Sequence, residues 1–202
     1  MIMIPKEAEK VIITIDGRVC SGKSTLIQGL LNRLSQLYGY NVPHYSCGEY
    51  YRNHLRTRLP NELVDDAMID YVHQIYQNND RAIIDGRSSG FSLQGWEKLT
   101  DEKKLITVLC DVNQVEQVDR IKARHQNATL SIIGEELERD HRDKRRCFLR
   151  FGRDIFDRQN YDIYIDTSGK SPSENLQQLL KELNKKVDFI GARDPGRPGD
   201  AR

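Results

Sequence analysis

The segment GRVCSGKS at residues 17–24 constrains the fold of this chain more than any other part of the sequence. It follows VIITID at residues 11–16, a β-branched apolar run that is typical of a buried strand. Two glycines and a Lys-Ser pair at this spacing are typical of a loop that binds phosphate between a strand and a helix. Backbone N–H groups of such a loop, at the positive end of the following helix, point toward phosphate oxygens. The segment therefore predicts a nucleotide phosphate site in an α/β fold.

The loop fits the Walker A pattern, and several of its residue types have a physical use. Gly22 allows the backbone to approach closely, Lys23 can reach the β- and γ-phosphates, and the Ser24 hydroxyl can ligate Mg²⁺. ATP is the expected donor, with Mg²⁺ as its metal ion. Seven loop residues are expected to bind the nucleotide: Gly17, Cys20, Ser21, Gly22, Lys23, Ser24 and Thr25. Arg18 has no evident role, and Cys20 is interpreted as a small loop residue, with a redox-sensitive thiol as the alternative.

Strand and helix patterns alternate along the rest of the chain. Strands are predicted at residues 11–15, 41–46, 81–85, 105–111 and 161–166. Helices are predicted at residues 26–37, 62–77 and 114–126, and from Pro172 onward. Gly39 stands where the first of these helices should end. Parallel strands connected by helices form a sheet covered on both faces, so we expect an α/β chain of the P-loop NTPase fold with a five-stranded parallel sheet flanked by helices.

Length and composition disfavour several classes of protein. A chain of 202 residues with 38% apolar and 30% charged residues suits a single soluble domain, and its apolar runs are shorter than a membrane span. The formal net charge of +1 gives no general attraction to nucleic acid. The four cysteines show no Cys-x-x-Cys or Cys/His ligand spacing. We expect a cytoplasmic monomer that acts on small nucleotides, with neither a nucleic-acid nor a membrane partner.

Arginines follow two strands of the predicted sheet at their carboxyl ends, where sheets of this kind bind ligands. Arg52 lies in SCGEYYR, after the second strand. Arg87 lies in IIDGRSSG, after the third strand and two residues beyond Asp85. Each arginine taken alone is better explained as a solvent-exposed charge. Their shared position beyond the strands makes them candidate ligands for an anion.

The densest charge run, ERDHRDKRR at residues 138–146, is predicted to be helical. Arg139, Asp143 and Arg146 are spaced to share one face of that helix. Taken alone, the run is equally well explained by a solvated helix face. Together with the phosphate loop, the arginines indicate a second anion site. A kinase needs such a site when its acceptor already carries a phosphate, because that negative charge must be neutralised before transfer.

From about Val11 to Leu180, the chain resembles the nucleoside monophosphate kinases, and the cytidylate kinases most of all. The motifs that carry the resemblance are TIDGRVCSGKST, SCGEYYR, IDGR, VDRIKAR, ERDHRDKRR and YDIYIDTSG. FGRD at residues 151–154 is similar to the Tyr-Gly-Ile-Asp of archaeal-type members. In cytidylate kinases, the arginines of an Arg-x-x-x-Asp-x-x-Arg pattern hold phosphates and the aspartate meets the acceptor ribose.

The resemblance also implies a domain organisation. It implies one P-loop kinase domain at residues 1–192, with an acceptor-binding segment at about 47–80 and a lid at about 125–146. Residues 193–202 are rich in glycine, proline and charge, and we expect them to form a disordered tail.

The activity that the resemblance implies is transfer of the γ-phosphoryl group of ATP to CMP or dCMP, with UMP as a further candidate acceptor. The implied catalytic residues are Lys23, Arg87, Arg139 and Arg146. The implied substrate-binding residues are Arg52, Asp85, Arg87, Arg139, Asp143 and Arg146. Ser24 is the implied Mg²⁺ ligand, and Asp85 would reach the metal through water. No general base is required, because the acceptor phosphate is already an anionic nucleophile.

Two other functions remain open at this point. A nucleoside or other small-metabolite kinase would also pair a phosphate loop with an arginine-rich lid, although its acceptor would give Arg52 and Arg87 no phosphate to bind. A non-catalytic nucleotide-binding regulator could keep the same fold. The segment between Arg52 and Asp85 is shorter than in most cytidylate kinases, where it closes over the base, so the base and sugar of the acceptor are left open.

Overall fold

A single parallel sheet organises the computed structural model, which describes residues 10–38, 41–56, 58–59, 61–94, 103–126 and 128–187. Its strands are β1 (Val11–Gly17), β2 (His44–Ser46), β3 (Arg81–Asp85), β4 (Lys104–Asp111) and β5 (Ile163–Asp166). They lie in the order β2-β3-β1-β4-β5, and every neighbouring pair is parallel. The predicted five-stranded parallel sheet is confirmed.

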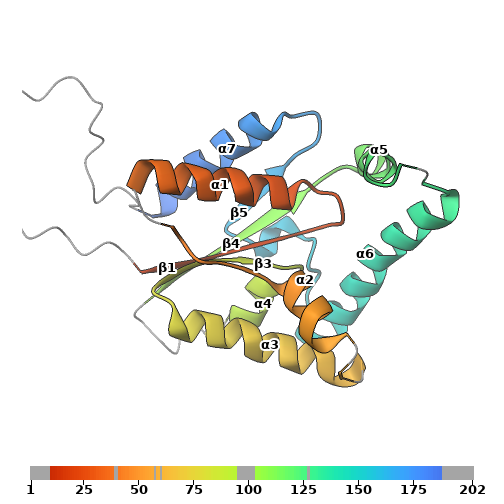
Figure 1. Ribbon diagram of the computed structural model, residues 1–202, viewed down its shortest axis with the longest axis horizontal. Coiled ribbons are helices and arrows are strands. Elements are labelled where there is room, and N and C mark those ends of the chain that lie inside the picture. The colour runs from red at the N-terminus through yellow and green to blue at the C-terminus, as the bar shows by residue number, and fades with distance from the viewer. Residues whose placement is uncertain are drawn as a thin grey trace, which may run out of the picture.

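Helices cover both faces of the sheet (Figure 1). One face carries α1 (Lys23–Tyr38) and α7 (Pro172–Lys186), and the other carries α3 (Asn61–Asn78) and α4 (Ser89–Leu93). Alternate residues of β1 face opposite sides, as the pleat of a strand requires. Ile13 and Ile15 pack in the core cluster under α1 and α7, whereas Ile12 packs with the residues of α3 and α4. Burial of β1 on both faces explains why its sequence is apolar without alternation.

Three further helices lie at the carboxyl ends of the strands (Figure 1). The short α2 (Cys47–Tyr50) follows β2 and continues into a π-helical turn at Tyr51–Leu55. After β4, the chain forms α5 (Gln114–Arg124) and then α6 (Leu130–Phe151), whose far end approaches α3. α6 ends at Gly152, which has a φ of +68°, a left-handed conformation that glycine adopts without strain. Most of the proposed lid at about 125–146 is therefore α6.

The element boundaries differ from the predictions by a few residues. The strand expected at 41–46 begins at His44, because Pro43 has no N–H to donate, although its carbonyl still accepts a hydrogen bond from Ile83 N at 2.9 Å. The strand expected at 161–166 begins at Ile163. Gly39 and residues 193–202 lie outside the described residues. None of the helices in the described ranges has the length and apolar character needed to cross a membrane.

Candidate active site

The phosphate loop connects β1 to α1 at the carboxyl edge of the sheet. Gly17 lies so close to β4 that a Cβ atom there would be 2.2 Å from the carbonyl oxygen of Cys110, so only glycine fits. Gly22 has a φ of +80°, which also favours glycine. The hydroxyl of Ser21 is buried in the loop and has no hydrogen-bond partner among the described residues. It lies beside Gly17, 2.8 Å from the position of a Cβ atom there.

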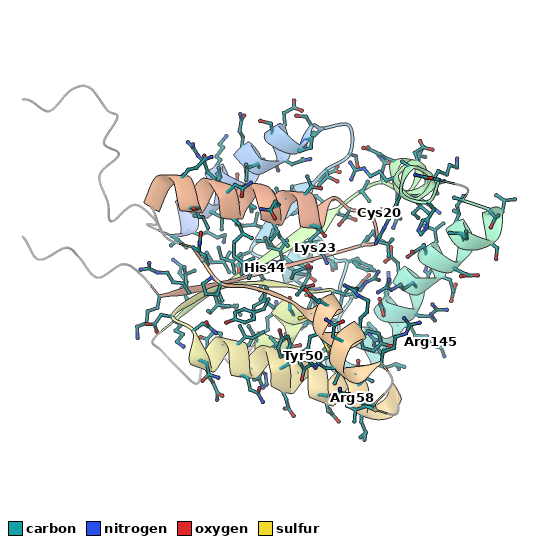
Figure 2. All side chains as sticks on the ribbon, in the orientation of Figure 1. Cys20, Lys23, His44, Tyr50, Arg58 and Arg145 are labelled. Carbon is teal, nitrogen blue, oxygen red and sulfur yellow. The ribbon has the colours of Figure 1, made fainter. Side chains whose placement is uncertain are left out.

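Lys23 lies between α1 and the sheet (Figure 2) and contacts the end of β3. Its Nζ is 2.7 Å from Asp85 Oδ1 and donates a hydrogen bond of 2.6 Å to the carbonyl oxygen of Gly86. Ser46 Oγ donates to the other carboxylate oxygen of Asp85 at 3.3 Å. The loop lysine and the predicted metal-site aspartate are thus neighbours. Ser24, also in the first turn of α1, is exposed.

Arg18 and Cys20 now have structural explanations. Arg18 Nε donates to Asp111 Oδ1 at 2.8 Å, and its guanidinium lies 4.3 Å from the centre of the Phe156 ring, so this residue fastens the loop to the end of β4. Cys20 has a φ of 56°, a left-handed conformation that is uncommon for a residue other than glycine. Its side chain lies on the side of the loop that faces α5 and α6 (Figure 2), against the apolar cluster of Val19, Ile121 and Ile133.

The turn that carries Arg87 is held by a buried carboxylate at the end of β1. Asp16 is fully buried and accepts hydrogen bonds of 2.9 Å from the backbone N–H groups of Ser89 and Gly90. Burial raises the pKa of Asp16 above the ordinary aspartate value, and these hydrogen bonds oppose that rise. The segment after β3 is therefore fixed against the strand that leads into the phosphate loop.

Arg87 does not stand free beside the loop. Its Nη1 donates to Asp140 Oδ1 at 2.9 Å and also to Asp143, both on α6. All three side chains are largely buried, with 18% of Arg87, 5% of Asp140 and 11% of Asp143 exposed. The structure thus brings the predicted residues Arg87 and Asp143 together, as an ion pair between the sheet edge and α6.

The two arginines of the predicted lid, Arg139 and Arg146, lie near this ion pair. Arg146 is 3.1 Å from Asp143 and 3.3 Å from Asp65 of α3, so it connects α6 to the predicted acceptor segment. Arg139 is about half exposed, at 49%, and 3.9 Å from Glu136. Burial of its inner part lowers the pKa of Arg139, and the positive charge of Arg87 lowers it further. The carboxylates of Asp143, Glu136 and Asp140 act on the pKa of Arg139 in the opposite direction.

Arg52 is placed differently from the other predicted arginines. It lies in the π-helical turn after α2 and is exposed. No residue in the described part of the chain forms an ion pair with it, and its guanidinium lies back over Gly48. The same segment carries Tyr50 (Figure 2). The ring of Tyr50 stacks on that of Tyr71 of α3 at a centroid distance of 3.7 Å. The structure does not bring Arg52 into contact with Arg87.

Asp140 is a central residue that the sequence reasoning missed. Besides Arg87, it accepts hydrogen bonds from the backbone N–H of Val19 in the phosphate loop at 3.1 Å and from Gln117 Nε2 of α5 at 2.7 Å. One buried carboxylate therefore joins the loop, the segment after β3, α5 and α6. The available signal was helical spacing: Asp140 continues the buried face of α6 that Ile133 and Cys147 define.

We expect Asp140→Ala to lower the free energy of unfolding by about 3–5 kcal/mol, because it leaves the Arg87 charge and two further donors without this partner. Glu138→Ala is the matched control, since Glu138 is exposed on the same helix and should change stability by less than about 0.5 kcal/mol. Urea denaturation of both variants measures the difference. Equal effects of the two substitutions would contradict the role given to Asp140.

A cavity of about 300 Å³ opens beside the phosphate loop. Its lining residues are Gly22, Thr25, Leu26, Arg120, Thr167, Lys170, Pro172 and Asn175. The Arg120 guanidinium is held by Glu116 at 2.6 Å and by hydrogen bonds of 2.8 Å to both the hydroxyl and the carbonyl oxygen of Thr167. The cavity is of the size that binds small molecules, and it adjoins the place expected for the phosphates. No sequence pattern indicated a role for Thr167, Lys170 or Asn175.

Comparison with known proteins adds to this geometry. No family model matches the chain. Three curated proteins are similar to it, and all are named cytidylate kinase. The Thermoplasma acidophilum protein is 27% identical over 194 residues, which cover 88% of this chain and 96% of the relative. The Sulfolobus acidocaldarius protein is 27% identical over 187 residues, covering 86% of this chain and 94% of the relative. The chain is related to the cytidylate kinases.

Solved structures share the fold at low sequence identity. An uncharacterized protein from Eubacterium ventriosum has a TM-score of 0.65 at 15% identity, over 86% of this chain and 98% of that protein. Shikimate kinase from Bacteroides thetaiotaomicron has a TM-score of 0.56 at 14% identity, over 86% and 98%. The Mycobacterium tuberculosis APS kinase CysC, in complex with AMPPNP and APS, has a TM-score of 0.55 at 16% identity, over 89% and 99%. The P-loop kinase fold is confirmed, and the sequence relatives support an ATP-dependent phosphotransferase.

Proposed function

We propose that this protein transfers the γ-phosphoryl group of ATP to the phosphate of CMP or dCMP, with UMP as a further acceptor. The observation that carries the proposal is the group of three arginines, Arg87, Arg139 and Arg146, at the carboxyl edge of the sheet that also bears the phosphate loop. They would give a second anion its own site by exchanging carboxylate partners for it. The sequence relatives support the coarser statement, a nucleotide kinase.

On the donor side, the backbone N–H groups of the loop would bind the phosphates of ATP. Lys23 would leave Asp85 for the β- and γ-phosphates, since the charge of these oxygens exceeds that of one carboxylate. The Ser24 hydroxyl and the Asp85 carboxylate are oxygen donors of the kind that Mg²⁺ prefers, and the departure of Lys23 would release Asp85 for a metal-bound water. Mg²⁺, when bound, neutralises charge on the phosphates.

On the acceptor side, Arg87 would exchange a lid carboxylate for the phosphate of the nucleoside monophosphate. A dianionic phosphate can accept the paired donors of the guanidinium, and Asp143 would then be free to accept from the acceptor ribose. Arg139 and Arg146 would approach the transferring group as α6 closes, where they stabilise the charge that spreads over its oxygens. Closure would also exclude water and so limit hydrolysis of ATP.

The decisive test measures ADP release with ATP and Mg²⁺ for a panel of acceptors. CMP, dCMP and UMP are compared with AMP and GMP, with cytidine, and with shikimate and gluconate as acceptors from other P-loop kinases. We expect kcat/KM for CMP or dCMP to exceed that for cytidine by at least about 10³-fold, because cytidine lacks the phosphate that the arginines bind. A preference for cytidine, shikimate or gluconate over every nucleoside monophosphate would refute the proposal.

A further inference from the structure

Two side chains from outside the phosphate loop hold the backbone of Val19. Its N–H donates to Asp140 Oδ1 at 3.1 Å, and its carbonyl oxygen accepts from Gln117 Nε2 at 2.9 Å. Gln117 Nε2 also donates to Asp140 Oδ2 at 2.7 Å, and both residues are buried. The next residue, Cys20, has a φ of 56°, a conformation that a residue other than glycine keeps only where its surroundings impose it. Asp140 and Gln117 therefore help to fix the conformation of the loop at this point.

The oxygen of Asp140 that holds Val19 also holds Arg87. Oδ1 accepts the Val19 N–H at 3.1 Å and a hydrogen bond from Arg87 Nη1 at 2.9 Å. Only 5% of the Asp140 side chain and 18% of the Arg87 side chain are exposed, so water screens this contact weakly. One atom therefore connects the loop that would bind the donor phosphates with the arginine that would bind the acceptor phosphate.

The two carboxylates that Arg87 contacts differ in what their departure would break. In the described part of the chain, Asp143 pairs with Arg87 and Arg146 and contacts neither the phosphate loop nor α5. A phosphate that displaces Asp143 would leave the loop unchanged. Displacing Asp140 would instead leave the buried N–H of Val19 without its acceptor, which costs stability. We therefore expect Arg87 to exchange Asp143 for the acceptor phosphate while it keeps Asp140.

We propose that Asp140 is a positioning residue that couples the two substrate sites, so that a nucleotide on the phosphate loop strengthens binding of the acceptor at Arg87. The inference rests on the proposed function, because it requires one anion on the loop and a second at Arg87. Phosphates on the loop would fix its backbone, and the Val19 N–H would then fix Asp140 and, through it, the Arg87 guanidinium. The acceptor would meet an arginine that is already in place, which lowers the cost of binding it. Linkage requires the acceptor to strengthen binding of the donor nucleotide by the same factor.

Calorimetric titration of CMP, with and without saturating ADP and Mg²⁺, measures this coupling. ADP and CMP occupy both sites without a γ-phosphoryl group to transfer. We expect the wild type to bind CMP at least about fivefold more tightly when ADP is bound, the lower end of the usual range for coupled sites. In Asp140→Ala, the two affinities for CMP should differ by less than about twofold, because the connection between loop and arginine is gone. Titration of ADP with and without CMP should give the same factor in each protein.

Two further variants separate coupling from stability. Asp140→Asn provides a second test should the alanine variant fail to fold, because it keeps an acceptor oxygen for Val19 but not the charge that holds Arg87. Its coupling factor should be at most about half that of the wild type. Leu183→Ala is the matched control, since Leu183 is 1% exposed in the core cluster under α1 and α7 and contacts no member of the Asp140 network. It should lose stability and keep the wild-type coupling factor.

The outcomes distinguish this inference from the proposed function. If both Asp140 variants keep the wild-type factor, the ligands couple by another route and Asp140 does not position Arg87. If Leu183→Ala lowers the factor as much as the Asp140 variants do, stability is the cause and the proposal is wrong. If the wild type binds ADP and CMP independently and still transfers phosphate to CMP, the inference fails and the proposed function stands. If the wild type binds no nucleoside monophosphate, both fail.

Discussion

Lys23→Ala should reduce kcat/KM for phosphoryl transfer by about 10³-fold or more, while the protein remains folded. In the unliganded protein, Lys23 Nζ contacts Asp85 and Gly86 at the end of β3, so the ammonium already lies beside the edge where donor and acceptor would meet. Removing it takes away a positive charge next to the β- and γ-phosphates, and no other lysine belongs to the loop. Steady-state ADP release with the best acceptor measures the loss.

Stability must be measured beside activity, because Lys23 also has a structural partner. Asp85 is only 14% exposed, so its carboxylate loses a buried ion pair when Lys23 is removed. The hydrogen bond from Ser46 to this carboxylate remains. The single variant should therefore lose about 1–3 kcal/mol of unfolding free energy. The double variant Lys23→Ala/Asp85→Ala should regain part of this stability without regaining turnover. A folded Lys23→Ala that keeps more than a tenth of wild-type activity would show that the donor assignment is wrong.

Sequence patterns predicted well the elements that are determined by residues close to one another in the sequence. The β-branched run of β1, the leucine spacing of α1 and the Pro172 start of α7 each depend on neighbours within a few residues. α7 begins as such patterns predict, with Pro172 in its first turn and a capping box between Ser171 and Glu174. The glycine and lysine positions of the phosphate loop are likewise a local pattern, because one turn between strand and helix requires them.

The contacts that sequence patterns missed join distant parts of the chain. Arg18 bonds to Asp111, 93 residues away, and the backbone of Val19 bonds to Asp140, 121 residues away. Neither spacing leaves a periodic signal. For the same reason, Arg87 was predicted as a ligand for phosphate but not as the partner of two lid carboxylates. The position of Arg87 after β3 could be predicted from the sequence. Its neighbours could not, because they depend on how α6 crosses the edge of the sheet.

Arg87→Ala should reduce kcat/KM for the acceptor by about 10³-fold and change the affinity for ADP by less than about threefold. The asymmetry follows from the fold. Arg87 follows β3 and contacts α6, whereas the cavity is lined by residues of the phosphate loop, α1, α5, α7 and the turn after β5. Loss of its guanidinium would remove the paired donors for the acceptor phosphate and leave the donor cavity intact.

Because Arg87 also neutralises Asp140 and Asp143, the alanine variant will lose stability, and Arg87→Lys provides the sharper comparison. Lysine keeps the positive charge between the two carboxylates but presents a single ammonium in place of the planar fork, so turnover should still fall by at least about tenfold. Arg145→Ala is the matched control, since Arg145 is exposed on α6 (Figure 2) and should act like the wild type. Separate measurements of acceptor KM, kcat and ADP affinity decide the assignment. If ADP affinity falls as much as acceptor affinity, Arg87 belongs to the donor site. If neither KM nor kcat changes, the second anion site lies elsewhere.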